Sequence, residues 1–236
     1  CPFHGEKTPS FTVDEERNLF YCFGCHEGGD VFKFIMKSEN CNFMDAVKFL
    51  ANKYGIPIPE RQKTAAEIAR EQKAKQVIET NELAARFYQA CLTKSSYGKA
   101  ALTYLHKRGI SDEIISSFSI GYALNSFDSL LNALGKRGYS QELLMQAGLA
   151  VPGKNSGAYD KFRNRVMIPI KDPRGRIVGF TGRILGDGMP KYMNTGETEY
   201  FIKRYLLFGL DIAVNEIRKT RQAIVVEGHM DAISLH

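Results

Sequence analysis

The chain has 236 residues, of which 44% are hydrophobic and 25% are charged, and its formal net charge is +6 at pH 7. This length and hydrophobic content are sufficient for one or two domains with buried cores. No apolar run approaches the roughly 18 residues that a membrane helix needs and no signal peptide is visible, so we expect a soluble, cytoplasmic protein.

The N-terminal segment contains four potential zinc ligands in two pairs. Cys1 and His4 form a Cys-x2-His pair, Cys22 and Cys25 form a Cys-x2-Cys pair, and 17 residues lie between the pairs. Sulfur and imidazole ligands in two closely spaced pairs are what a tetrahedral structural zinc ion requires. The alternative interpretation is a Cys-x-x-Cys redox pair, but no βαβ pattern surrounds it as in a thioredoxin-like site. We therefore expect a zinc ribbon.

Two cysteines remain outside this motif, and the ends of the chain are unusual. We expect Cys41 and Cys91 to be small buried side chains in a reducing cytoplasm, and His26 to be a surface residue. A zinc ligand stands at the first position, there is no initiator Met, and His236 ends an apolar run. We therefore expect a fragment of a longer protein.

A small zinc-binding domain is predicted over residues 1–58. Residues 11–13 and 18–23 are rich in β-branched and aromatic side chains and predict the two arms of a ribbon. We expect a helix capped by Asp30 to follow, and a second helix over 43–54. A domain of this size has a small core, so zinc must supply much of its stability.

The next part of the chain has a helical pattern. Residues 59–76 are charged and Ala-rich, which predicts a partly helical linker. Helical periodicity then becomes stronger and marks the start of a second domain over 77–220. The predicted helices are 77–92, 98–107, 111–118, 126–135 and 140–147.

Strand character returns late in the second domain. Residues 165–171 and 176–185 flank Asp172-Pro-Arg-Gly175, a sequence that favours a type I turn, so we predict a β-hairpin. A helix is expected over 203–219.

Residues 221–236 have a different pattern from the hairpin region. An apolar run over 222–226 is followed by a small residue and a helix over 230–235, which predicts a first βα unit of an α/β domain. The predicted fold class is thus α+β and multidomain. A zinc ribbon is followed by a mixed α/β subdomain with a basic hairpin and by the start of an α/β fold.

Positive charge is concentrated in two blocks. Residues 61–108 contain 10 Lys and Arg against 4 Asp and Glu, and residues 161–221 contain 13 against 6. The first block is interpreted as a solvated helix. In the second, Arg163 and Arg165 are alternate residues of a predicted strand and are expected to project together as a cationic wall for phosphates. A hairpin with ordinary surface charges is the alternative interpretation.

A short motif follows the hairpin and adds further candidates. Lys191, Tyr192 and Asn194 come after Pro190 in a Gly-rich loop, and Lys203 is a dozen residues farther on. A cation beside an aromatic ring can bind a phosphate and a base together. Alone, this motif is weak evidence.

Two carboxylates flank the last predicted strand-to-helix turn. Glu227 and Asp231 are four residues apart at the carboxyl end of the predicted strand, where open α/β sheets place their sites. Such a pair can help to hold a divalent ion or move a proton. A charge pair at a helix N-terminus is the alternative.

In this order, the segments resemble a bacterial DnaG-type DNA primase. The resemblance is collinear and covers the whole chain, which makes it more specific than any single motif. The segment Cys-Pro-Phe-His-Gly-Glu-Lys-Thr-Pro-Ser-Phe at 1–11, with Tyr-Cys-Phe-Gly-Cys at 21–25, is similar to the family's zinc domain. Residues 163–170 and 175–183 resemble the basic hairpin of its RNA polymerase domain, 190–198 with Phe201 and Lys203 the next motif, and 226–231 the opening of its Toprim fold.

The resemblance implies synthesis of short RNA primers from ribonucleoside triphosphates on a single-stranded DNA template. The zinc domain would contact the template, Mg²⁺ or Mn²⁺ would assist phosphoryl transfer, and the replicative helicase would bind a domain beyond this chain. Glu227 and Asp231 would be the catalytic acids. Residues implied in binding nucleic acid or nucleotides are Arg108, Arg163, Arg165, Arg183, Lys191, Tyr192, Asn194 and Lys203.

One departure from the family concerns the catalytic metals. Toprim catalysis also needs an Asp-x-Asp pair, and none occurs in this sequence. We expect the missing acids to follow His236 and this chain to be inactive alone. Two rival hypotheses are the primase part of a phage or plasmid primase-helicase, and a noncatalytic zinc-ribbon module that binds single-stranded DNA. A Walker A loop downstream would reveal a helicase.

Overall fold

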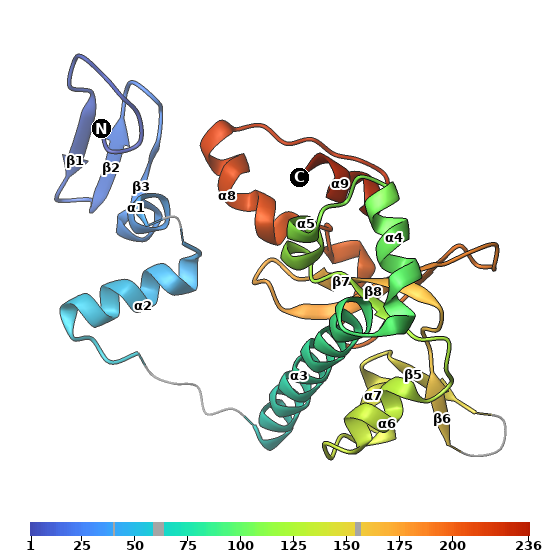
Figure 1. Cartoon of the computed structure of the whole chain (residues 1–236). Helices are drawn as coiled ribbons and strands as arrows, with labels where there is room; N and C mark the ends of the chain where they lie inside the picture. Colours follow the sequence, from blue (N-terminus) through green and yellow to red (C-terminus); the bar gives the residue numbers. More distant parts are fainter. Residues whose placement is uncertain (40, 59–63, 154–156) are drawn as a thin grey trace. The chain divides into compact units, whose positions relative to one another are not determined.

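The computed structural model describes residues 1–39, 41–58, 64–153 and 157–236 (Figure 1). These residues belong to two compact units, 1–63 and 64–236. None of the described helices combines the length and the apolar character that crossing a membrane requires.

The first unit contains a three-stranded antiparallel sheet and two helices. The strand order is β1-β2-β3, so the two predicted ribbon arms pair as expected and a third strand is added. Gly28 and Gly29 of this added strand have low strand propensity, which explains why the sequence did not predict it. The elements are β1 (Phe11–Asp14), β2 (Leu19–Cys22), β3 (Gly28–Asp30), α1 (Val31–Ser38) and α2 (Phe43–Tyr54).

Aromatic rings form the core of the first unit. The rings of Phe3, Phe11, Phe20 and Phe34 pack with centroids 5.3 to 6.3 Å apart. The predicted cap is present, because the carboxylate of Asp30 accepts a hydrogen bond from the third residue of α1. One ring cluster is a small core, so this unit depends on further stabilisation.

The second unit starts with a long helix, α3 (Ala65–Thr93). A capping box begins it: the Thr64 hydroxyl accepts from the amide of Glu67 at 3.2 Å, and the Glu67 carboxylate accepts from the amide of Thr64 at 2.9 Å. Residues 65–76, predicted as part of a partly helical linker, are therefore continuous with the helix that we expected from Val77. The other predicted linker residues, 59–63, lie outside the described residues.

A four-stranded antiparallel sheet in the order β4-β7-β8-β9 forms the centre of the second unit. The predicted hairpin is confirmed, and the amide of Gly175 donates to the carbonyl of Asp172 across its turn at 2.8 Å. The two outer strands have three residues each and were not predicted. The strands are β4 (Gly121–Ala123), β7 (Arg165–Lys171), β8 (Ile177–Ile184) and β9 (Tyr192–Asn194).

Helices cover both faces of this sheet (Figure 1). Val166 and Ile168 point into a core shared with α4, α5 and α9, whereas Met167 and Phe180 point into a second core shared with α3, α6 and α7. The predicted short helices are thus present and pack on a common sheet. Their bounds are α4 (Lys99–Lys107), α5 (Asp112–Ser117), α6 (Ser129–Gly135), α7 (Gln141–Gln146) and α9 (His229–Leu235).

Near the C-terminal end one prediction was confirmed only in part, and another was wrong. The helix expected over 203–219 is a single 3-10 turn, η2 (Lys203–Tyr205), and then α8 (Leu210–Thr220), because Gly209 adopts a left-handed conformation. The strand expected over 222–226 is not formed. A strand needs a hydrogen-bonded neighbour, and in the described chain this segment has none; Ile224 and Val225 are 83% and 78% exposed.

A buried carboxylate joins a small two-stranded sheet to α6. This sheet contains β5 (Ala150–Pro152) and β6 (Ala158–Asp160). Asp160 is 1% exposed, and its carboxylate accepts from the amides of Leu130 and Leu131, at 2.8 and 3.0 Å, and from the hydroxyl of Ser129. Burial raises the pKa of Asp160, and the three donors oppose that shift. Asp160 therefore caps α6 from a distant strand.

Replacing Asp160 with Ala should lower the free energy of unfolding by about 3 kcal/mol, because two helix amides lose their acceptor inside the protein. Urea unfolding of the whole chain, followed by circular dichroism, measures this loss. Ser129→Ala is the matched control and should cost about 1 kcal/mol or less, since both amides keep their acceptor. Equal losses in the two variants would contradict the capping role.

Candidate zinc centre and nucleic-acid interface

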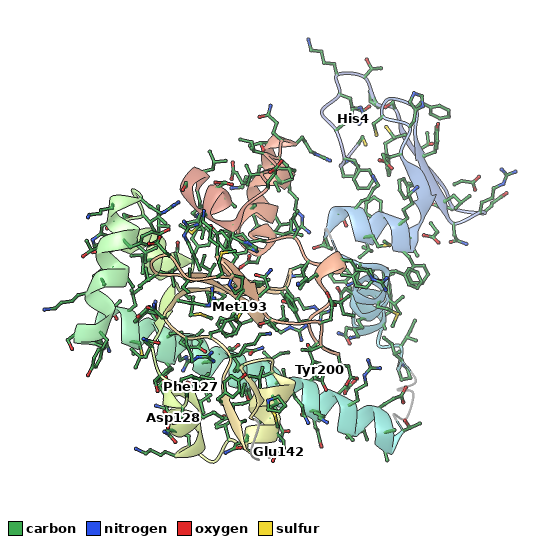
Figure 2. All side chains as sticks on the ribbon, turned by 90° about the vertical axis from the view of Figure 1, so that its right-hand side faces the viewer. His4, Phe127, Asp128, Glu142, Met193 and Tyr200 are labelled. Carbon is green, nitrogen blue, oxygen red and sulfur yellow. The ribbon has the colours of Figure 1, made fainter. Side chains whose placement is uncertain are left out.

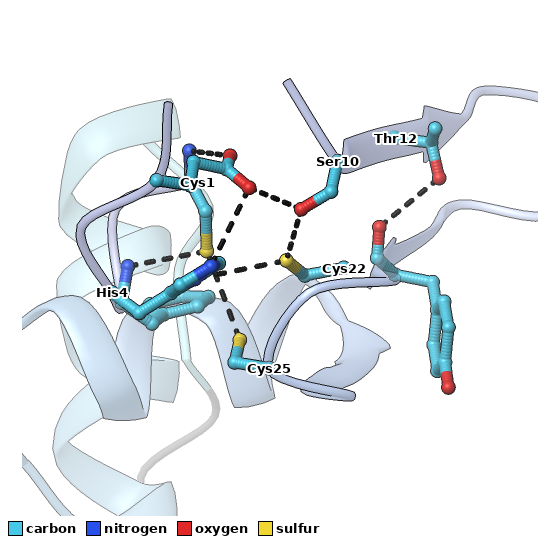
Figure 3. A network of polar contacts seen from close by, with 9 residues as sticks. Cys1, His4, Ser10, Thr12, Cys22 and Cys25 are labelled. Carbon is cyan, nitrogen blue, oxygen red and sulfur yellow. Dashed lines mark hydrogen bonds and ion pairs between the residues drawn. The ribbon is translucent and has the colours of Figure 1, made fainter. Parts of the chain in front are cut away.

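The four predicted zinc ligands converge in the first unit (Figure 3). The ligand atoms of Cys1, His4, Cys22 and Cys25 all lie within 4.8 Å of one another. The Sγ atoms of Cys1 and Cys25 are 3.9 Å apart, and Cys22 Sγ is 3.8 Å from His4 Nδ1. Tetrahedral coordination with Zn–S bonds of about 2.3 Å separates two sulfurs by about 3.8 Å. The donor set and its spacing thus fit zinc.

Local backbone structure brings the second ligand pair into place. Cys22 ends β2, and its amide and carbonyl bond to Glu27 and His26, each at 2.8 Å, which closes the turn that carries Cys25. Gly24 lies in this turn, and a Cβ atom there would be only 2.7 Å from the His4 ring. Glycine is therefore required for the two pairs to approach. His26 is exposed, as expected.

Polar side chains support the ligands from behind. Glu6 Oε2 lies 3.4 Å from His4 Nε2, so Nδ1 is the ring nitrogen that faces the sulfurs. The Ser10 hydroxyl donates to Glu6 and lies 3.2 Å from Cys22 Sγ. Burial acts to raise the pKa of Cys22, but the Ser10 hydroxyl and the turn's backbone bring it down to about 7. A lowered pKa favours the thiolate, the form that binds zinc.

Arg163 and Arg165 do not form the predicted wall. Asn164 between them has a φ of 50°, so strand alternation does not extend to Arg163, and β7 begins at Arg165. Arg165 is 3% exposed, and its guanidinium donates to the carbonyls of Gly182, at 3.1 Å, and Pro190, at 2.9 Å. Burial and the Arg163 charge lower the pKa of Arg165. Arg165 therefore ties the segment before β9 to the sheet.

Arg163 instead packs against aromatic rings. Its guanidinium carbon lies 4.5 Å from the ring centroid of Phe127 and 5.1 Å from that of Tyr159. Phe127 precedes α6 and is labelled in Figure 2. The guanidinium of Arg163 also donates to the carbonyl of Asp160 at 2.5 Å. These contacts are far apart in sequence, and the pattern around 163–165 gave no signal for them.

Arg183 lies on the face of the sheet opposite Arg165. Arg183 pairs directly with Val166, the residue after Arg165, and successive residues of a strand point to opposite faces. The Arg183 guanidinium lies 5.0 Å from the ring centroid of Tyr192 and donates to its hydroxyl. The same guanidinium lies 5.5 Å from the ring centroid of Tyr104. The predicted residues Arg183 and Tyr192 thus contact each other. Arg183 also contacts Tyr104, a residue that the sequence did not single out.

Arg108 belongs to the same region. It follows α4, and its guanidinium carbon lies 5.2 Å from the ring centroid of Tyr104. Lys191 precedes β9 and is exposed. Cationic side chains from α4, from β8 and from the start of β9 are therefore present on this part of the second unit.

A separate pocket of about 190 Å³ gathers other candidates. Asn194, Lys203 and His229 line it together with apolar side chains. Asn194 Oδ1 is buried and has no hydrogen-bond partner within the described residues. Burial and the nearby charge of Lys203 lower the pKa of Lys161, which places a second amine close to Lys203. Burial likewise lowers the pKa of His229. The pocket thus offers one amine, an amide and an imidazole.

The two predicted catalytic acids lie on either side of the pocket residue His229 in the sequence, but neither of them lines the pocket. Glu227 is exposed in the turn before α9, and Asp231 is in the first turn of that helix. Outside the zinc cluster, the described residues contain no group of three or more acidic, His or Cys side chains close enough to hold a metal. Two carboxylates alone are an incomplete metal site.

Comparison with known proteins gives the class and then the family. The family model for the CHC2 zinc finger matches residues 1–66, and that for the N-terminal domain of the DNA primase catalytic core matches 87–214. The fold and site therefore define a zinc ribbon joined to the N-terminal domain of a primase catalytic core. The chain belongs to the bacterial DNA primase family.

Curated relatives and solved structures agree with this assignment. The DNA primases of Deinococcus radiodurans and Pseudomonas putida are 44% and 43% identical over all of this chain, which spans 39% and 36% of their lengths. The structure of the DnaG primase catalytic domain bound to ssDNA matches 70% of this chain and 53% of its own length, with a TM-score of 0.65 and 38% identity. The structure of the Aquifex aeolicus primase (zinc binding and RNA polymerase domains) matches 99% of this chain and 55% of its own length, with a TM-score of 0.62 and 34% identity.

Loss of one zinc ligand should unfold the first unit alone. Cys22→Ser removes a thiolate from a unit with a small core, so the calorimetric unfolding transition of the first unit and its bound zinc should be lost together. Calorimetry and zinc analysis of the whole chain measure this effect. The transition of the second unit should remain, and a single cooperative loss of both units would contradict separate folding.

Glu6→Gln should weaken zinc binding by about tenfold while preserving the fold, because the carboxylate behind His4 orients the ring and raises its basicity. Competition with a chromogenic zinc chelator measures the dissociation constant. The matched control is Glu16→Gln, which alters an exposed acid between β1 and β2. Equal zinc affinity in the Glu6 variant and the wild type would show that Glu6 has no such role.

Proposed function

We propose that this chain is the template-binding and nucleotide-binding part of a primase that joins ribonucleotides into short RNA primers on single-stranded DNA. In chemical terms it belongs to a nucleotidyltransferase, a DNA-directed RNA polymerase. Residues 1–58 are the zinc-binding domain, and 59–76 connect it to 77–220, the N-terminal subdomain of the RNA polymerase domain. Residues 221–236 open a Toprim fold.

The relatives support this proposal at the level of the whole protein. The chain spans well under half the length of the curated primases that it matches. Single-stranded DNA is bound in one solved relative, and a duplex with a 6-nucleotide overhang is bound in the RNA polymerase domain of the Mycobacterium tuberculosis primase. The same class of ligand is therefore proposed for this chain.

One observation within the chain carries the proposal. Arg183 is only 8% exposed, yet in the described part of the protein no carboxylate lies within salt-bridge distance of its guanidinium. Unlike Arg165, whose guanidinium donates to two carbonyls, the Arg183 guanidinium donates in the described residues only to the Tyr192 hydroxyl, and such a buried cation is costly unless an anion binds to it. Arg183 also lies beside the partly exposed ring of Tyr192. A guanidinium beside an aromatic ring suits a nucleotide, since one group binds the phosphate and the other stacks on a base.

The pocket with Asn194 and Lys203 supplies a second point of attachment. Lys203 and the neighbouring Lys161 attract phosphates, and the free amide oxygen of Asn194 accepts from a sugar hydroxyl or base. Lys191 adds an exposed cation near Tyr192. The zinc domain, with its exposed Tyr21 and other aromatic side chains, contacts the template.

Metal-assisted phosphoryl transfer requires more acids than this chain brings together. Mg²⁺ or Mn²⁺ neutralises charge on the reacting phosphates when it is bound. Glu227 and Asp231 would provide part of its carboxylate shell, and Glu227 would also hold or accept a proton. Because the sequence has no Asp-x-Asp pair, the chain alone should bind its substrates without joining them. A replicative helicase is the proposed partner of the complete protein.

Arg183→Ala tests the nucleic-acid interface. The variant should bind a fluorescein-labelled single-stranded thymidine oligonucleotide about tenfold more weakly at low salt, because a phosphate contact is lost. The slope of log affinity against log salt should become shallower by about one. Fluorescence anisotropy of the whole chain across a salt series measures both quantities.

The control for this experiment is Arg174→Ala, which removes an exposed arginine from the β7–β8 turn without altering the Tyr192 contact. It should leave the salt slope unchanged. An identical response of the two variants would mean that only net charge matters, and the proposed interface at Arg183 would be rejected.

A further inference from the structure

Tyr104 connects two of the proposed nucleic-acid-binding arginines. It lies in α4 and packs against the core that α4 shares with α5 and α9. The guanidinium carbons of Arg108 and Arg183 lie 5.2 and 5.5 Å from the centroid of its ring. Arg108 is one helical turn beyond Tyr104, whereas Arg183 comes from β8. A single ring therefore contacts cations from two distant parts of the chain.

A second ring extends this arrangement. Arg183 also contacts Tyr192 at 5.0 Å and donates to its hydroxyl. Rings and guanidinium groups thus alternate in the order Arg108, Tyr104, Arg183 and Tyr192. Two like charges near each other repel, and the negative faces of the rings offset that repulsion. Planar guanidinium groups that pack on rings also lose rotational freedom before any ligand binds.

The Tyr104 hydroxyl does not explain the position of this residue. It is buried and has no hydrogen-bond partner among the residues that the structure describes. A buried hydroxyl without a partner lowers stability, so a phenylalanine would suit the packing equally well. The contacts that remain are those between the ring and the two guanidinium groups. The ring is therefore the functional part of this side chain.

We propose that Tyr104 is a positioning residue whose ring holds Arg108 and Arg183 as a two-point clamp for the phosphodiester backbone of single-stranded DNA. This inference rests on the proposed function, because it assigns the same ligand to Arg183. Tyr104 itself does not contact the strand. It acts by fixing the distance and orientation of two cations that bind neighbouring phosphates.

Three variants of the whole chain test the clamp with the labelled thymidine oligonucleotide. Tyr104→Leu removes the ring and should weaken binding about three- to tenfold, with a salt slope shallower by about one. Tyr104→Phe keeps the ring and should retain wild-type affinity and slope. Leu102→Ala is the matched control, since it removes apolar packing from the same helix without contacting either arginine; it should lower the melting temperature and leave the slope unchanged.

An NMR measurement without DNA separates positioning from general destabilisation. The Nε–H resonance of Arg183 should carry a ring-current shift in the wild type and in Tyr104→Phe, and part of that shift should disappear in Tyr104→Leu. Leu102→Ala should retain it. If Tyr104→Leu does not fold, Tyr104→Met replaces it, because methionine fills the space without an aromatic ring.

The outcomes distinguish this inference from the function on which it rests. If Arg183→Ala itself has an unchanged salt slope, the proposed interface fails and the clamp fails with it. If Arg183→Ala flattens the slope while Tyr104→Leu or its Met substitute binds as the wild type does, the interface stands and the positioning role of Tyr104 is overturned. A loss of affinity in Tyr104→Phe equal to that in Tyr104→Leu would overturn the role of the ring, since the hydroxyl would then be the important group.

Discussion

Side chains of β7 point alternately into two separate cores, and the strand is hydrogen-bonded on both sides, to β4 and to β8. Such a strand has no face toward solvent. A cation in it must therefore be buried and satisfied within the protein, as Arg165 is by two carbonyl groups. The neighbouring strand β8 is also hydrogen-bonded on both sides, but near its end the Arg183 guanidinium contacts aromatic side chains of α4 and β9 instead of backbone carbonyls. The partners available to each guanidinium, and not burial alone, thus distinguish the two arginines.

This constraint gives Arg165 and Arg183 different tasks although both stand in one basic hairpin. Arg165 joins β8 to the segment before β9 and so helps to place Tyr192. Arg183, on the opposite face, contacts that tyrosine directly. A buried arginine can therefore contribute to a binding surface through the backbone that it holds. Substituting Arg165 would change the sheet as well as any charge, which makes Arg183 the cleaner probe of nucleic-acid binding.

Local patterns in the sequence predicted the parts of the fold that local chemistry determines. The ligand spacing, the hairpin turn at Asp172 and the cap at Asp30 are all specified within a few residues. Alternation failed at Arg163 because the left-handed conformation of Asn164 interrupts the strand, and a sequence pattern does not reveal such a residue. The short strands β4 and β9 have too few residues for a periodic signal and exist because β7 and β8 offer them partners.

Contacts between distant segments account for what the sequence did not predict in the candidate site. Arg108 is close to Tyr104 along the chain, but the second contact of the ring arises only where β8 brings Arg183 to it. Asp160 likewise caps a helix that precedes it by many residues. Apolar residues over 222–226 satisfied a strand pattern, but hydrophobicity alone does not supply a pairing partner.

The ligands of the first unit define a structural metal site and not a catalytic one. In the first unit, four protein side chains would complete a tetrahedral zinc shell, which leaves no position for a substrate. The zinc therefore stabilises a unit whose core is mainly one aromatic cluster. In the second unit, the proposed catalytic acids Glu227 and Asp231 carry hard oxygen atoms of the kind that Mg²⁺ prefers, and alone they would leave most of a metal shell open. Ligand type and ligand number together thus assign the zinc to folding, and the phosphoryl transfer that we propose needs acids outside the zinc-binding unit.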